Sequence, residues 1–154
     1  MTAPPMTRRF DKYEGLGNDF VVLDGERWPE AEVTPTLARQ LCDRHTAIGA
    51  DGVIWVGRTG RGGARMVIYN ADGSRPEMCG NGVRCVAAWL ADQGVVADGE
   101  TVVVESDAGP RAATLRGREC GAWRVEVDMG AAVVSAREQV CVADVTLAVR
   151  PVDM

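Results

Sequence analysis

The sequence predicts an α+β fold in which a mostly antiparallel sheet packs around one long apolar helix. Most apolar segments are short and are separated by turn residues, which is typical of strands joined by tight connections. Glycine supplies 18 of the 154 residues, about 12% against a usual ~7%, which also favours many turns. Only residues 82–93 combine helical periodicity with a mainly apolar composition.

The first half of the chain predicts two strand pairs with one helix between them. Residues 1–8 are expected to form a loose leader before a domain that covers residues 9–154. Thr34 is suited to cap a helix that has Pro35 at its first position and ends near residues 44–45. The strands expected in this half cover residues 10–13, 19–23, 53–56 and 66–69, with turns at residues 15–18 and 57–63.

The second half predicts the apolar helix, followed by strands only. Val83, Val86, Ala87 and Leu90 recur at helical spacing, and Gly94 is a natural residue to follow the last helical turn. No internal repeat, low-complexity run or clear linker interrupts the chain. The strands expected after the helix cover residues 101–106, 111–115, 123–127, 139–142 and 146–149.

Charge and composition exclude several functional classes. The formal net charge is −5, from 17 basic and 22 acidic residues, so neither nucleic acid nor an anionic membrane is expected as a partner. The sequence has no run of ~18 apolar residues to span a membrane, and its first ten residues are not typical of a signal peptide. Its single histidine, His45, excludes zinc sites that need two histidines. Five cysteines without a CxxC pair indicate free thiols in a cytoplasmic protein.

The densest run of chemically useful residues precedes the long helix. Residues 79–82 (CGNG) place a thiol at the helix N-terminus, where unpaired backbone N–H groups and the helix dipole favour an anion. Such a position can lower a cysteine pKa from ~8.5 to about 3.5–7.5, so we expect Cys79 to alkylate fastest of the five cysteines near neutral pH. The same N–H groups suit a substrate carboxylate. The alternative interpretation is a glycine-rich helix cap with an incidental cysteine.

Four motifs, in order along the chain, resemble the N-terminal half of the diaminopimelate epimerases, a family of pyridoxal-independent amino-acid epimerases. The resemblance covers roughly residues 9–154. At this motif the proline-racemase branch is similar to MCGHG. This chain has MCGNG instead, with Asn81 in place of the histidine, which argues against that branch. The matching segments are residues 12–20 (KYEGLGNDF), 43–45 (DRH) with 48–52 (IGADG), 69–74 (YNADGS) and 78–84 (MCGNGVR).

The resemblance implies a two-thiol mechanism in a fold of two similar halves, each a sheet curled around a central helix. One thiolate would remove the α-proton, and a thiol from the other half would deliver a proton to the opposite face. Cys79 matches the catalytic cysteine of the N-terminal half, while Asn18, Asn70, Gly80 and Asn81 match substrate-binding positions. The N–H groups of Gly80 and Asn81 would hold the substrate carboxylate and stabilise developing enolate charge. The resemblance implies diaminopimelate or a related amino acid as substrate, with no metal and no organic cofactor.

The family's second half, with its GNPH motif and second catalytic cysteine, has no counterpart in these 154 residues. We expect the second thiol to come from a complementary C-terminal-half subunit in a heterodimer, with a C-terminal half omitted from these 154 residues or lost from the gene as alternatives. A homodimer that places two copies of Cys79 across one cleft is an alternative. The remaining cysteines lack the glycine-rich, helix-capping context and are expected to be packing or turn residues; they are Cys42, Cys85, Cys120 and Cys141.

Two further functional classes stay open on the sequence alone. The chain could be a non-catalytic amino-acid-binding or assembly module of the same fold, or a thiol-dependent lyase or dehydratase that uses a single base. His45 could act as a general base, although its place near a helix end favours a structural role. Asp72 and Glu77 could pair as carboxylates, although their surroundings favour turn and surface positions.

Overall fold

A computed structural model describes residues 7–60, 62–134, 138–142, 145–149 and 152–153 of the chain. Residues 1–6 of the expected leader therefore lie outside the described residues. The elements are, in chain order, β1 (Asp11–Gly15), β2 (Asn18–Asp24), a 3-10 helix (Glu30–Glu32), α1 (Pro35–Cys42), β3 (Gly52–Arg58), β4 (Ala64–Asn70), α2 (Gly80–Asp92), β5 (Thr101–Ser106), β6 (Gly109–Glu119), β7 (Ala122–Val127), β8 (Val133–Val134), β9 (Glu138–Val142), β10 (Val145–Val149) and β11 (Val152–Asp153).

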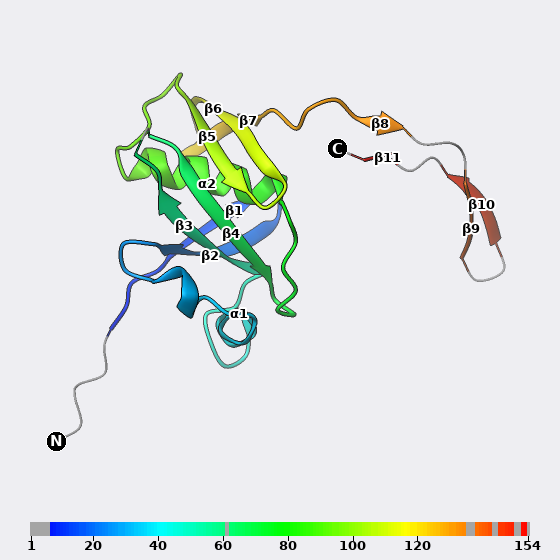
Figure 1. The fold of residues 1–154 in the computed structure, drawn as a ribbon, viewed down its shortest axis with the longest axis horizontal. Helices are drawn as coiled ribbons and strands as arrows, with labels where there is room; N and C mark the ends of the chain where they lie inside the picture. Colours follow the sequence, from blue (N-terminus) through cyan, green and yellow to red (C-terminus); the bar gives the residue numbers. More distant parts are fainter. Residues whose placement is uncertain (1–6, 61, 135–137, 143–144, 150–151, 154) are drawn as a thin grey trace.

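The first seven strands form one curled sheet in which neighbours in sequence are neighbours in space (Figure 1). Four of its six pairings are antiparallel, so the predicted α+β fold with a mostly antiparallel sheet is confirmed. The pairs β2–β3 and β4–β5 are parallel, which the sequence reasoning did not anticipate. Each parallel pair is joined through a helix, α1 in the first case and α2 in the second.

The two helices cover opposite faces of the sheet and create two cores. Because β2 and β3 run opposite to β4 and β5, two crossovers of the same hand place their helices on opposite faces. Side chains alternate accordingly along the central strands: on β2, Phe20 and Val22 join the core with α2, whereas Val21 and Leu23 join the core with α1. Strands buried on both faces explain why β2, β3 and β4 are apolar without alternation in the sequence.

Helix α2 begins two residues earlier than predicted and ends at Asp92, one residue earlier than predicted, with Gln93 as its C-cap. Cys79 itself is the N-cap, in extended conformation, so Gly80 and Asn81 become the first helical residues. At the other end, Gly94 has a φ of 72°, the left-handed conformation that glycine adopts without steric cost. The N–H of Gly94 donates to the carbonyl of Ala91, and that of Val95 donates to the carbonyl of Leu90, which together satisfy the helix C-terminus.

Local sequence signals also determine where helix α1 begins and the tight turn between β1 and β2. The Thr34 hydroxyl accepts a hydrogen bond from the N–H of Leu37 at 3.2 Å, as expected of an N-cap, and the helix ends at Cys42, two residues before the predicted end. Leu16 and Gly17 both have positive φ, the conformation of a two-residue turn that matches the twist of the flanking strands. This turn joins β1 to β2 and places Asn18 directly after it.

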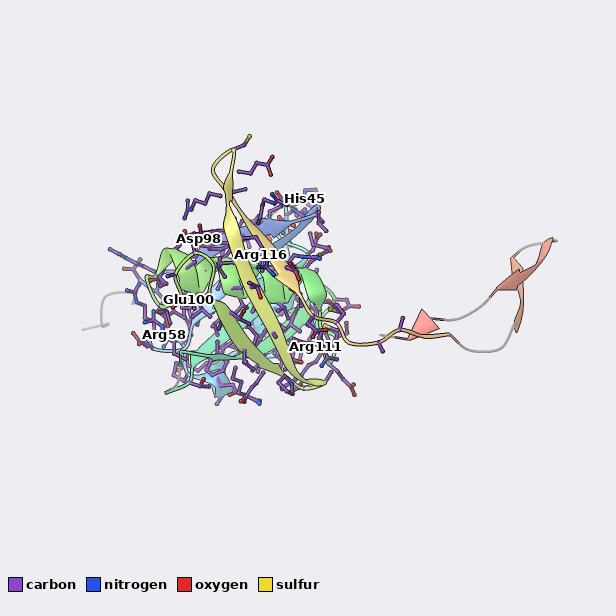
Figure 2. The ribbon with its side chains drawn as sticks, turned by 90° about the horizontal axis from the view of Figure 1, so that it is seen from above. His45, Arg58, Asp98, Glu100, Arg111 and Arg116 are labelled. Carbon is purple, nitrogen blue, oxygen red and sulfur yellow. The ribbon has the colours of Figure 1, made fainter. Side chains whose placement is uncertain are left out.

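The C-terminal strands stand apart from the seven-stranded sheet. Strands β9 and β10, which the sequence predicts, pair with each other, and the short strands β8 and β11 form a second pair. Figures 1 and 2 both show these strands lying away from the body of the molecule. Neither helix in the described part of the chain has the length and apolar character that a membrane crossing requires.

The core that surrounds α2 should respond strongly to truncation of Leu90. This side chain is fully buried, so Leu90→Ala leaves a cavity and should lower the free energy of unfolding by about 2–5 kcal/mol. Leu16→Ala is the matched control because Leu16 is 80% exposed, and it should change stability by only about 0.5 kcal/mol. Urea denaturation measures both, and equal losses would contradict the burial of this face of α2.

Candidate active site

Cys79 lies at the point where the loop after β4 enters helix α2. Its thiol sulfur accepts a hydrogen bond from the N–H of Gly82 at 3.4 Å, and its carbonyl accepts from the N–H of Val83 at 2.9 Å. The first N–H groups of a helix have no acceptor within the helix itself, which leaves those of Gly80 and Asn81 available to a ligand. Cys79, Gly80 and Asn81 are all half-buried, so the residues that carry the thiol and the two N–H donors are in part accessible to solvent.

Asn18 and Asn81 are 63 residues apart in sequence but are directly hydrogen-bonded. The Asn81 side-chain N–H donates to the Asn18 oxygen at 2.9 Å. The β1–β2 turn makes this contact possible because it passes close to the first turn of α2: a Cβ on Gly15 would lie 3.6 Å from the Asn81 carbonyl oxygen. The structure therefore brings Asn18 to the helix N-terminus that carries Cys79.

Asn70 lies at the same end of the sheet as Asn18. It ends β4 and pairs with Gly52 of β3, which in turn pairs with Phe20 of β2. The Asn70 side-chain N–H donates to the hydroxyl of Ser74 at 2.8 Å, inside the turn that follows β4. The register thus aligns the two strand ends that carry the predicted asparagines.

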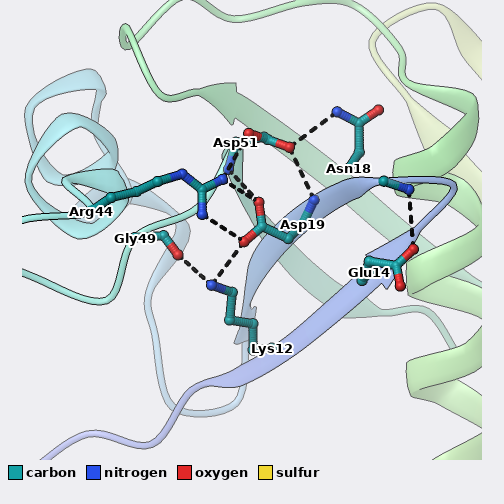
Figure 3. A network of polar contacts seen from close by, with 8 residues as sticks. Lys12, Glu14, Asn18, Asp19, Arg44, Gly49 and Asp51 are labelled. Atoms are coloured by element: carbon teal, nitrogen blue, oxygen red, sulfur yellow. Dashed lines mark hydrogen bonds and ion pairs between the residues drawn. The ribbon is translucent and has the colours of Figure 1, made fainter.

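A cluster of ion pairs anchors the start of β2 (Figure 3). Arg44 donates to Asp19 at 2.6 Å and to Asp51 at 2.9 Å, while Lys12 lies 2.9 Å from Asp19 and also donates to the carbonyl of Gly49. Hydrogen bonds from Arg44 hold the pKa of the Asp19 carboxyl well below its usual range, although burial opposes this shift. The cluster joins β1, β2 and the loop after α1, and its member Asp51 accepts a hydrogen bond from Asn18 at 3.3 Å.

Two charged residues at the site were not assigned a role from the sequence. Arg84 donates to the side-chain oxygen of Asn81 at 2.8 Å, and Asp51 contacts Asn18 from the other side. The Arg84 contact could have been predicted, because residues three apart on a helix lie on the same face. The Asp51 contact joins two distant segments and has no local sequence signal.

Met129 was also missed, and it covers part of the helix N-terminus. It follows β7, and a Cβ added to Gly80 would lie 3.4 Å from the Met129 sulfur. The Met129 side chain therefore lies over the first turn of α2, at a distance that a Cβ at position 80 would also allow.

The other cysteines differ from Cys79 in environment. Cys42 and Cys85 are buried, and burial raises the pKa of both thiols, to about 12 for Cys85. Cys120 is exposed in the turn between β6 and β7, as the sequence predicts. Cys141 lies in β9, and its side chain is outside the described part of the chain.

The weaker sequence candidates do not gather at this site. His45 is exposed after α1, and its backbone N–H donates to Asp43 (Figure 2). Asp72 accepts from the N–H of Ser74, which is a turn contact, and Glu77 accepts through its carbonyl from Ala108. Among the residues that the structure describes, no three His, Cys, Asp or Glu side chains are arranged to hold a metal ion.

A hollow of about 610 Å³ lies beside the site rather than at it. It is bounded by β1, the outer face of α2 and the β6–β7 hairpin, with Arg84 and Cys85 on its wall. Cys79 and the three asparagines do not line it. We place the candidate site at the helix N-terminus because the thiol and the N–H donors converge there.

Comparison with known sequences identifies similar proteins. The family model described as diaminopimelate epimerase matches residues 10–135. The diaminopimelate epimerase of Synechocystis sp. is 48% identical over 128 residues, which cover 81% of this chain and 43% of the relative. That of Picosynechococcus sp. is 46% identical over 136 residues, which cover 86% of this chain and 47% of the relative. The chain thus spans less than half the length of these curated relatives.

Comparison with solved structures supports the same architecture. A protein described as a predicted epimerase from Pseudomonas aeruginosa matches with a TM-score of 0.68 at 17% identity, over 86% of this chain and 46% of its own. At this identity the match shows the fold alone.

The Asp19 cluster predicts a pH-dependent contribution to stability. Because the folded pKa of Asp19 is lowered, its contribution is fully present above the unfolded pKa of ~3.9 and is lost as the pH falls toward the folded value. Asp19→Asn should therefore cost about 1–3 kcal/mol at pH 7, and the difference from the unaltered protein should shrink below about pH 4. Thermal or urea unfolding between pH 2 and pH 8 measures this. Glu126→Gln, which removes an exposed ion pair with Arg116, is the control and should change little at any pH.

The cysteine environments predict an order of alkylation by iodoacetamide at pH 7. Cys79 should react before Cys120 although Cys120 is the more exposed, because the Cys79 sulfur lies at a helix N-terminus and accepts a hydrogen bond from the N–H of Gly82. Cys42 and Cys85 should react only on unfolding. Peptide mapping by mass spectrometry gives the order, and faster labelling of Cys120 than of Cys79 would contradict an activated thiol at the helix cap.

Proposed function

The chain belongs to the diaminopimelate epimerase family, and we propose that it supplies one half of the active site of a cofactor-independent amino-acid epimerase. The carrying observation is the convergence of Cys79, the N–H groups of Gly80 and Asn81, and the Asn18 side chain at the N-terminus of α2. The substrate is diaminopimelate or a related amino acid.

The chemistry proposed for this half-site is proton transfer at the α-carbon. The Cys79 thiolate takes the α-proton and becomes a thiol, and the electron pair of the broken C–H bond moves toward the substrate carboxylate. The N–H groups of Gly80 and Asn81 donate to that carboxylate and stabilise the negative charge as it grows. In the reverse direction, the Cys79 thiol delivers the proton, so one residue serves as base for one stereoisomer and as acid for the other.

Inversion also needs a second acid on the opposite face of the α-carbon. Among the other cysteines whose side chains the structure describes, Cys42 and Cys85 are buried in separate cores, and Cys120 sits in a hairpin turn. We therefore assign the second thiol to a complementary half, which a heterodimer would supply. The length comparison supports the need for a complementary half, because the relatives are more than twice as long as the matched region.

A homodimer is the alternative that keeps the two-thiol chemistry. Two copies of Cys79 facing each other across a two-fold axis would be equivalent groups, each able to act as acid or base. A binding module of the same fold, which holds an amino acid without turnover, is the alternative outside catalysis.

Exchange of the α-proton in D₂O, followed by NMR, tests the proposal. The chain is assayed alone and mixed with a polypeptide that carries the complementary half, with LL- and meso-diaminopimelate and then a panel of amino acids. We expect exchange in the mixture. Exchange by the chain alone would support the homodimer, and calorimetric binding without exchange would support the binding module. Absence of exchange under every condition would overturn the epimerase proposal.

Substitution of the thiol tests the assignment of Cys79. Cys79→Ser should lower exchange that starts from one stereoisomer by about 10²–10⁴-fold, the usual contribution of a general acid–base group. Cys120→Ser is the matched control and should leave the rate unchanged, since Cys120 lies in the β6–β7 turn. Full activity of Cys79→Ser would show that another group moves the proton.

A further inference from the structure

A continuous chain of side-chain hydrogen bonds crosses the candidate site from a cation to an anion. Arg84 donates to Asn81 at 2.8 Å, Asn81 donates to Asn18 at 2.9 Å, and Asn18 donates to Asp51 at 3.3 Å. The four residues come from three separate places: helix α2, the start of β2 and the loop before β3. Asp51 is held in turn by Arg44 at 2.9 Å (Figure 3).

The charged residues at the two ends of this series of hydrogen bonds, Arg84 and Asp51, determine the direction of every hydrogen bond within it. A guanidinium only donates hydrogen bonds and an ionised carboxylate only accepts them, whereas a side-chain amide does both. Rotation of the Asn81 amide by half a turn would set its NH₂ group against Arg84. The same rotation of Asn18 would set its oxygen against Asp51. Each flip exchanges a hydrogen bond for a contact between like groups, so the charged ends favour one orientation of both amides.

The fixed direction determines what the amides offer to a ligand. In each amide the oxygen and one N–H hydrogen are used within the chain of hydrogen bonds. Among the residues that the structure describes, none takes the second N–H hydrogen of Asn18 or of Asn81, so both amides can present a donor to a ligand. The backbone N–H groups of Gly80 and Asn81 are donors as well.

We propose that Arg84 and Asp51 are positioning residues that set the amide orientation of Asn81 and Asn18, so that both present N–H donors to a hydrogen-bond-accepting group of the ligand. The part that concerns the ligand rests on the proposed function, whereas the amide orientation does not.

The orientation is tested on the chain alone by NMR of the side-chain amide groups of Asn18 and Asn81. Arg84→Met keeps a long side chain but removes the donor, and should shift the amide signals of Asn81 and also of Asn18, which Arg84 does not contact. Arg84→Lys keeps a donor and should retain most of the original pattern. Arg116→Met, which removes an exposed arginine from β6, is the matched control and should shift neither amide.

Asp51→Asn tests the same chain of hydrogen bonds from its other end. The new amide can donate to Asn18 as well as accept from it, so the signals of both asparagines should shift. This variant keeps the test decisive if Arg84→Met does not fold. Unchanged amide signals of Asn18 and Asn81 in either folded variant would overturn the proposal.

The effect on the ligand is tested in the exchange-competent complex with meso-diaminopimelate. Arg84→Met should raise KM about tenfold to hundredfold, as expected for loss of a charge-assisted hydrogen bond, with a smaller change in kcat, and Arg84→Lys should restore most of the affinity. An unchanged KM in Arg84→Met, in a complex whose unaltered form exchanges protons, would overturn the positioning role. Absence of exchange in the unaltered complex would instead overturn the proposed function and leave the NMR result standing.

Discussion

Burial of helix α2 within the curled sheet is the constraint on which the rest of the structure depends. Its apolar face fills one core with side chains from every strand of the sheet except β1 and β7, whose residues pack at its margin. The C-terminal half of the helix is also fixed by polar contacts: Trp89 donates to Asp11 of β1 at 2.8 Å, and Asp92 accepts from Tyr13 of β1 and from Trp123 of β7. A helix held at both edges of the sheet cannot slide along its axis, and a shift of one turn would move its N-terminus by about 5.4 Å. The place of Cys79 therefore follows from contacts made three turns away.

The fold could be predicted from the sequence wherever the signal is local. Thr34 followed by Pro35 predicts the start of α1, and Gly94 predicts the end of α2, because caps and left-handed turn residues act within a few positions of themselves. The start of α2 was placed two residues late because Cys79 is not a typical capping residue. The two parallel strand pairs were missed for a different reason. Short strands suggest antiparallel hairpins. However, two strands with a helix between them in sequence can also pair in parallel through a crossover. Only the packing of the helix on one face of the sheet decides between antiparallel and parallel pairing.

The candidate site also has one part that the local sequence predicts and another that only the assembled fold explains. Cys79, Gly80 and Asn81 form a contiguous motif, so their convergence at a helix N-terminus is predictable from the sequence. The resemblance to a known family adds Asn18 and Asn70 but gives no reason for their positions. That reason is the register of the sheet, which aligns the start of β2 with the end of β4, together with a turn that carries Asn18 to α2. Contacts between segments 63 residues apart depend on the assembled fold and leave no periodic pattern.

The two edges of the seven-stranded sheet have a consequence for the behaviour of the protein at high concentration. Strands β1 and β7 end the sheet, and an open strand edge is a template for pairing with another molecule. Both edges carry charged, exposed side chains: Asp11, Lys12 and Glu14 on β1, and Arg124 and Glu126 on β7. Because strand addition would bring such charges together and strip them of water, these residues protect the chain against edge-to-edge aggregation.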